Sequence, residues 1–313
     1  MLWDTHMHTS FSGDSEASPE SMIDRALELG LPGICFTDHL DYDYPQEPGL
    51  FFLDLPAYAD TVHRLQKTYP ATPGFSASAS GCTACLEDDP ASHSARFRAE
   101  HCSAGNTVNP FSEKNTNGFC VCFGIELGLQ PHLAERHRAV VNAWDFDFVI
   151  GSSHVVRGRD PYYPNYYEGR TQTAAYREYF ESILENIAAF DGFDVYGHLD
   201  YVVRYGPNKN AAYHWEDYAD VIDEILRQLI ARGKGLEVNT AGFKSGLGHP
   251  NPTEGILCRY RELGGEILTV GADAHCPEHI AYDFRKLPDL LKSCGFSRYA
   301  VFRKRKPEFL PLP

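Results

Sequence analysis

Two histidines separated by one residue, His6 and His8, follow a short apolar run. Alternate residues of a strand project to the same side, so both imidazoles can face one point and chelate a metal ion. The pair alone is equally compatible with two structural histidines. Five further apolar runs favour the metal reading, because each ends in residues of the types that bind metals: Phe36 to His39, Gly124 to Glu126, Gly151 to His154, Tyr196 to His198 and Gly271 to His275.

These positions define a set of candidate ligands: His6, His8, Asp14, His39, Glu126, His154, His198, Asp273 and His275. Imidazoles and carboxylates without an obligatory thiolate suit Zn, Mn or Fe. At about four to five donors per ion, with water completing each shell, the set can hold two or three divalent metal ions. Ions ~3.5–4 Å apart can share a hydroxide and clamp the oxygens of a displacement at phosphorus. The pattern therefore predicts phosphate ester hydrolysis by a metal-bridging hydroxide.

Alternating helices and strands must position these ligands. Expected strands cover about 2–9, 33–37, 119–126, 146–150, 194–198, 235–239, 266–271 and 299–302, with helices at about 19–29, 56–69, 133–142, 173–190, 215–232, 253–263 and 282–294. Such alternation implies parallel strands joined by right-handed crossovers. An open sheet gathers its site at one switch point, whereas here nearly every strand end offers a ligand. We therefore expect a distorted (β/α)7 barrel, in one domain over residues 1–313.

One stretch breaks the alternation. From about Ala71 to Asn117 neither a helical nor a strand period persists, and Ser, Ala, Gly, Asn, Thr and Pro dominate. A loop of this length inside a compact domain is unusual. Cys82 and Cys85 form a Cys-x-x-Cys pair that could chelate zinc. We favour a flexible surface insertion, because a second ligand pair at a suitable spacing is missing.

Composition narrows the class of partner. The formal charge is −15, with 28 Lys and Arg against 43 Asp and Glu, which disfavours a nucleic-acid polymer because phosphate backbones are bound by clustered cations. Bound metal ions could still invert the local field for a small phosphate ester. We expect no membrane span, since no run approaches the ~18 apolar residues required. The nine cysteines lack the spacing of a disulfide framework, which favours a cytoplasmic protein.

The motifs as a series resemble the PHP (polymerase and histidinol phosphatase) superfamily. The resemblance rests on His-x-His at 6–8, FTDHLD at 36–41, GIELG at 124–128, GSSHVV at 151–156, YGHLDYVVRYG at 196–206, LEVNTAG at 236–242 and GADAH at 271–275. It covers nearly the whole chain except the insertion, which is usually much shorter in relatives. Within the superfamily the sequence looks most like the histidinol phosphatases, which implies release of phosphate from L-histidinol phosphate in histidine biosynthesis.

The resemblance also implies how the ligands are shared among three ions. Three groups follow from it: His6, His8, Glu126 and Asp273; Glu126, His154 and His198; and Asp14, His39 and His275. Glu126 would bridge the first two ions. Asp273, His275 and Glu126 are the expected catalytic residues.

Residues near the strand ends could bind the substrate. Arg204 and Arg157 follow ligand motifs, where a guanidinium could grip two phosphate oxygens, although either could form a surface ion pair instead. Asn239 at a strand end could bond substrate or water, and packing is an equal alternative. His249 and Asp38 are candidate proton donors, while Asp38 is more typical of a residue that orients a ligand.

Two rival functions share this ligand set. Another PHP phosphoesterase would act on a nucleotide or a different small phosphate ester with the same metals and a different pocket. A non-enzymatic barrel with structural metals is the second rival, disfavoured because all nine ligand positions are intact. The sequence leaves the choice between a monomer and a homodimer open.

Overall fold

A curled parallel sheet forms the centre of the protein. The computed structural model describes residues 1–69 and 118–313. The sheet follows the order β1-β3-β4-β5-β6-β7, and β2 pairs with β3 beyond the end of β1. Its strands are β1 (Gly33–Phe36), β2 (His39–Leu40), β3 (Cys120–Gly128), β4 (Phe148–Ser152), β5 (Val195–Tyr196), β6 (Gly235–Asn239) and β7 (Leu268–Gly271). Every residue of these strands is buried, as expected for parallel strands covered on both faces.

The segment expected as the first strand, residues 2–9, joins the two edges of this sheet. It forms parallel bridges at Asp4 with Ile34 of β1 and at Met7 with Ala274 beyond β7. The Thr5 amide donates to the Val270 carbonyl at 3.0 Å. The segment makes only these isolated bridges, but it closes the ring. The distorted barrel that the sequence predicted is therefore confirmed.

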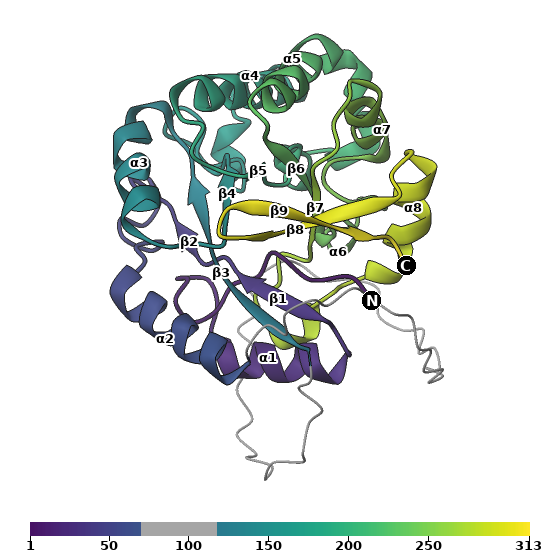
Figure 1. Ribbon diagram of the computed structural model, residues 1–313. Helices are drawn as coiled ribbons and strands as arrows, with labels where there is room; N and C mark the ends of the chain where they lie inside the picture. Colours follow the sequence, from purple (N-terminus) through teal and green to yellow (C-terminus); the bar gives the residue numbers. More distant parts are fainter. Residues whose placement is uncertain (70–117) are drawn as a thin grey trace.

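Helices surround the ring on the outside (Figure 1). They are α1 (Pro19–Glu28), α2 (Leu55–Thr68), α3 (Ala134–Ala143), α4 (Gln172–Ala189), α5 (Ala219–Ala231), α7 (Glu254–Glu262) and α8 (Leu287–Ser293), while the four-residue α6 (Ala241–Lys244) follows β6. Side chains of Ser18, Asp54 and Thr171 cap α1, α2 and α4 by accepting from backbone amides. Two helices begin later than expected, because 3₁₀ turns occupy Trp215–Tyr218 and Phe284–Lys286.

The last predicted strand was wrongly assigned to the parallel series. β8 (Arg298–Arg303) pairs antiparallel with β9 (Lys306–Pro311) in a separate two-stranded sheet. This hairpin crosses the sheet in Figure 1, and Phe302 stacks on Phe148 at the beginning of β4 with ring centroids 5.1 Å apart. The hairpin therefore covers the N-terminal end of the barrel. Its two-residue turn has φ of 48° at Lys304 and 64° at Arg305.

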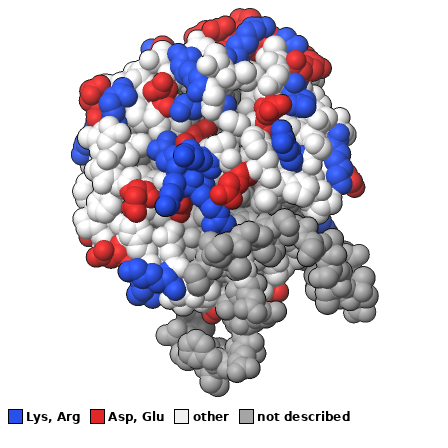
Figure 2. All heavy atoms as spheres, viewed as in Figure 1, with Lys and Arg blue, Asp and Glu red and all other residues white. Residues whose placement is uncertain are grey.

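The visible surface carries charges of both signs. On the face shown in Figure 2, Lys and Arg lie between Asp and Glu side chains. Arg303 pairs with Glu308 at 3.3 Å on the hairpin. None of the helices in the described part of the chain is long and apolar enough to cross a membrane. The expected insertion, with Cys82 and Cys85, lies outside the described residues.

Candidate metal centre

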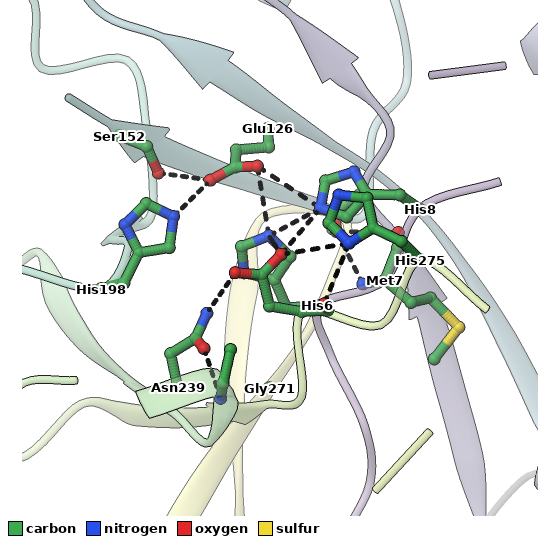
Figure 3. Close-up of polar contacts among 12 residues, drawn as sticks. His6, Met7, His8, Glu126, Ser152, His198, Asn239, Gly271 and His275 are labelled. Carbon is green, nitrogen blue, oxygen red and sulfur yellow. Dashed lines mark hydrogen bonds and ion pairs between the residues drawn. The ribbon is translucent and has the colours of Figure 1, made fainter. Parts of the chain in front are cut away.

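The nine candidate ligands come together at the C-terminal ends of the strands. Seven of them are buried: His6, His8, His39, Glu126, His154, His198 and Asp273. His275 is partly buried, and Asp14 is the most accessible. Figure 3 shows His6, His8, His275 and Glu126 pointing toward one another, with His198 reaching the far side of Glu126. The strand-end argument thus predicted the location of the cluster.

The first group of donors centres on His6 and His8. Their Nε2 atoms lie 3.1 Å apart, and Glu126 Oε2 lies 3.2 Å from His6 Nε2 and 3.6 Å from His8 Nε2. Asp273 Oδ1 approaches His8 Nε2 at 3.3 Å. His6 Nδ1 is 2.5 Å from Glu237 Oε1, so when the ring donates there, Nε2 presents a lone pair. Lone pairs and carboxylate oxygens that face one another fit a shared cation.

Glu126 links this group to a second one. While Oε2 faces His6 and His8, Oε1 lies 3.0 Å from His198 Nε2 and 3.3 Å from His154 Nε2. Ser152 Oγ donates to the same Oε1 at 2.6 Å, which fixes the carboxylate (Figure 3). One carboxylate with its two oxygens in two histidine groups has the geometry of a bridging ligand.

A third group lies toward the solvent. The imidazoles of His39 and His275 both stack against that of His8, with ring centroids 4.1 and 4.2 Å from it and 6.0 Å from each other. Ring nitrogens of these three residues all lie within 4.8 Å of one another. Asp14 Oδ2 is 3.0 Å from His275 Nε2 and 3.7 Å from His39 Nε2. The structure thus brings together all three groups that the resemblance implied.

The pKa values of the two histidines in the first group shift in opposite directions. Burial alone would lower the pKa of His6, but the charges of Glu237, Glu126 and Asp273 raise it well above its ordinary value. Burial lowers the pKa of His8 well below normal, and nearby imidazoles reinforce this. A neutral imidazole beside anionic carboxylates is the protonation state of a metal ligand. The residues present therefore fit divalent metal ions.

The local backbone explains how the ligands approach so closely. Asp273 lies in the left-handed region with φ of 54°, a conformation that Asp tolerates better than most residues and that recurs at functional sites. Gly271 precedes it at the end of β7. A Cβ at Gly271 would lie 2.3 Å from the His6 Cβ and 2.6 Å from Glu237 Oε1, so only glycine lets the first segment pack here.

Two of the three predicted substrate-binding residues reach the centre, but they bind its ligands. The buried Arg204 donates from Nη1 to Asp273 Oδ2 at 2.9 Å and from Nη2 to Asn239 Oδ1 at 2.9 Å. Its Nε donates to Asn251 Oδ1 at 2.8 Å. Asn239 in turn donates to Glu237 Oε2 at 3.2 Å. Arg204 and Asn239 thereby fix the orientation of Asp273.

Arg157 is not brought to the cluster. Its side chain is 49% exposed, and Nη2 lies 2.6 Å from Glu185 on α4. It lines a cavity of about 480 Å³ beside α4. This is the surface ion pair that the sequence had left open as the alternative for this residue.

The two candidate proton donors also differ. Asp38 is fully buried and accepts from the Thr9 amide at 2.6 Å and from Ser12 Oγ at 2.9 Å. Ser12 Oγ also accepts from the His39 amide. Burial raises the pKa of Asp38 to about 6 against these hydrogen bonds. Asp38 thus orients the ligand loop, while His249 is held by the Pro250 carbonyl at 2.7 Å.

Three buried carboxylates at the site contact the ligands or their backbone, and the sequence did not predict this role for them. Glu237 contacts His6 as described, and Asp41 Oδ2 lies 2.7 Å from His154 Nδ1. Asp4 accepts from the Ala272 and Ala281 amides at 3.0 and 2.8 Å, which ties the first segment to the end of β7. Carboxylates that fix the second ring nitrogen of a ligand tune its basicity. An acidic residue inside the apolar β6 was the available signal for Glu237.

The sequence matches the family model described as the PHP domain over residues 4–241. This match covers most of the chain, and it includes seven of the nine clustered residues. The protein therefore belongs to the PHP domain family.

Among curated proteins, the chain is 28% identical to the histidinol-phosphatase of Lactococcus lactis subsp. lactis over 97% of this chain and 95% of that one. It is 26% identical to the probable histidinol-phosphatase of Clostridium acetobutylicum over 97% and 98% of the two chains. Among solved structures, the L. lactis histidinol phosphate phosphatase complexed with zinc, L-histidinol and phosphate superposes with a TM-score of 0.78 at 27% identity, covering 98% of each chain.

Proposed function

We propose that this protein is a metal-dependent phosphomonoesterase, a histidinol-phosphatase that converts L-histidinol phosphate and water into L-histidinol and phosphate. The observation that carries the proposal is the position of Glu126, whose two carboxylate oxygens face two different histidine groups. Relatives of nearly the same length that are named histidinol-phosphatases support the choice of substrate.

The donor groups assign residues to ions. We assign one ion to His6, His8, Glu126 and Asp273, and a second to Glu126, His154 and His198. A third ion would be held by Asp14, His39 and His275. All three assignments are part of the proposal. Zn, Mn and Fe all suit such donors. When bound, such ions supply Lewis acidity and lower the pKa of water.

The protein's own residues set the geometry around that chemistry. Arg204 and Asn239 orient Asp273, while Glu237 and Asp41 orient His6 and His154. Because buried hydrogen bonds fix Asp273, His6 and His154, these three ligands need little reorganisation when substrate binds. Asp273, His275 and Glu126 are the proposed catalytic residues.

A row of tyrosines leads from the surface to the centre and fits the histidinol part of the substrate. Tyr201 lies 5.0 Å from His198, Tyr205 lies 5.0 Å from Tyr201, and Tyr162 lies 5.0 Å from Tyr205, all between ring centroids. Tyr162 is 42% exposed. Aromatic faces attract an ammonium or stack on an imidazole, and both groups are present in histidinol.

The test is phosphate release from L-histidinol phosphate by the purified protein supplied with Mn, Zn or Fe. A nucleoside monophosphate and an aryl phosphate are the comparison substrates. We expect a rate on histidinol phosphate well above both. Hydrolysis of the nucleotide alone would replace the proposed substrate by that of the rival phosphoesterase. A size measurement on the same preparation would decide between monomer and homodimer.

A further inference from the structure

A side-chain cation can bind phosphate oxygens alongside the metal ions, but both predicted arginines are paired with protein groups. Arg204 directs Nε, Nη1 and Nη2 to three protein oxygens. Arg157 is half exposed and pairs with Glu185 and Glu178 of α4. Another cation, Lys244, is the last residue of α6.

The position of Lys244 follows from the end of β6. Only Thr240 separates β6 from α6, so the short helix places Lys244 beside the C-terminal end of the barrel. Its ammonium lies 3.4 Å from His279 Nδ1, and Cys276 Sγ lies 3.2 Å from the same nitrogen. Cys276 directly follows the ligand His275. The lysine thus packs against the loop that carries Asp273 and His275.

The charges around Lys244 point to the ligand cluster. Burial lowers the pKa of Lys244, the negative charge of Asp273 opposes this, and Arg204, Cys276 and Asp14 act more weakly. Within residues 1–69 and 118–313, no carboxylate lies within ion-pair distance of its ammonium. A partly buried ammonium is costly without an anionic partner, and an anion bound at the cluster would supply one.

We propose that Lys244 binds a non-bridging oxygen of the substrate phosphate and of the phosphate product. Its ammonium is a compact charge with three donors, and its 3.4 Å contact with His279 Nδ1 places it against the loop that carries Asp273 and His275. This inference rests on the proposed function for the identity of the ester. The phosphate contact itself concerns any phosphate that occupies the centre.

Binding of inorganic phosphate to the metal-loaded protein tests this contact without turnover. Calorimetric titration should give a dissociation constant roughly tenfold to hundredfold higher for Lys244→Met than for the unmodified protein, as expected for a lost hydrogen bond between charged groups. Lys244→Arg should restore most of the affinity. Unchanged phosphate affinity in Lys244→Met would overturn the proposal.

Lys286→Met is the matched control. Lys286 lies on the neighbouring turn, pairs with Asp283 at 2.7 Å and sits 4.6 Å from the Phe243 ring. It should leave phosphate affinity unchanged. Metal content is measured for every variant. If Lys244→Met and the polar Lys244→Gln both lose metal or fold, Lys244 is a structural counter-ion and the proposal fails.

Binding of L-histidinol, which lacks the phosphate, separates this role from general damage. Its affinity should be the same in Lys244→Met and the unmodified protein, while the KM for the ester rises. If the unmodified protein binds phosphate through Lys244 but does not hydrolyse histidinol phosphate, only the proposed function fails. If it hydrolyses the ester and Lys244→Met does so with equal KM, only the Lys244 proposal fails.

Discussion

The two ends of the barrel both bury charged groups, but they balance the charge in different ways. At the N-terminal end, Arg305 Nε donates to Asp194 Oδ2 at 2.5 Å. Asp147 accepts from the Phe123 and Lys304 amides at 3.0 Å each. At the C-terminal end, carboxylates face imidazoles whose ring nitrogens point at one another. At the N-terminal end the charges are balanced by other groups of the protein, whereas the carboxylates at the C-terminal end require additional positive charge.

This difference separates a structural closure from a functional centre more clearly than burial does. A buried ion pair with all its hydrogen bonds made is costly to break but offers nothing to a ligand. A cluster of acceptors that requires cations is costly to keep empty, and it gains stability when ions bind. The predictions below address the two ends separately.

Asp273→Asn should have the largest effect. The amide keeps the shape of the side chain but removes the negative charge that balances an ion, so turnover of histidinol phosphate should fall by roughly a thousandfold or more. The circular dichroism spectrum should remain that of the folded protein. A variant with full turnover would show that Asp273 does not act at the centre.

Glu237→Gln should weaken the centre less, because Glu237 contacts a ligand and not the ions. Loss of its charge beside His6 Nδ1 should reduce metal affinity by about 10- to 100-fold. Competition with a chelator of known affinity measures this directly. Retained affinity would mean that the 2.5 Å contact with His6 is not needed to orient the ring.

Arg305→Met tests the opposite end. Removing the guanidinium leaves the buried Asp194 without its ion-pair partner, although the Val149 amide still donates to it, and this should reduce the free energy of unfolding by about 2 kcal/mol while kcat stays unchanged. Urea titration gives the first quantity and phosphate release the second. Arg298→Met is the control on the same hairpin, since its 3.8 Å pair with Glu266 is exposed on both sides and should contribute less than about 0.5 kcal/mol.

His137 on α3 offers a smaller, pH-dependent test away from both ends. It is fully buried against the rings of Tyr42 and Phe190, and burial lowers its pKa from the ordinary 6.5 to about 4. Because the unfolded chain binds the proton more readily, stability should fall as the pH decreases from about 6.5 toward 4, by about 2 kcal/mol at pH 5.

His137→Phe should remove this part of the pH dependence. Urea midpoints at pH 7 and pH 5 measure it in both proteins. If the variant loses as much stability between these pH values as the unmodified protein, His137 is not the group responsible.

Strand-end ligands were predictable because the chain marks them twice, by an apolar run and by the residue that ends it. The same reasoning predicted the closed ring of strands, because ligands at the ends of nearly every strand can meet only if the strands surround a common axis. The hairpin was missed for a physical reason. Its turn has positive φ at Lys304 and Arg305, whereas such turns are usually recognised by Asn or Gly.

The roles of buried polar partners could not be predicted from their own positions. Arg204 follows a ligand motif, but its contacts with Asn239, Asn251 and Asp273 depend on three separate strand ends meeting. Asp41 looked like a loop carboxylate and proved to be buried beside His154. Long-range contacts of this kind result from closure of the ring, and they leave no periodic pattern in the local sequence.

The closure between Thr5 and Val270 has a consequence for the order of events during synthesis. His6 and His8 leave the ribosome long before Asp273 and His275, and Glu126 emerges between them. A nascent chain that ends before β7 therefore lacks both the hydrogen bonds that hold the first segment and a full ligand set. In domains with such distant contacts the entropic cost of loop closure arises late in folding. The metal centre should therefore assemble only as the last parallel strand joins the ring.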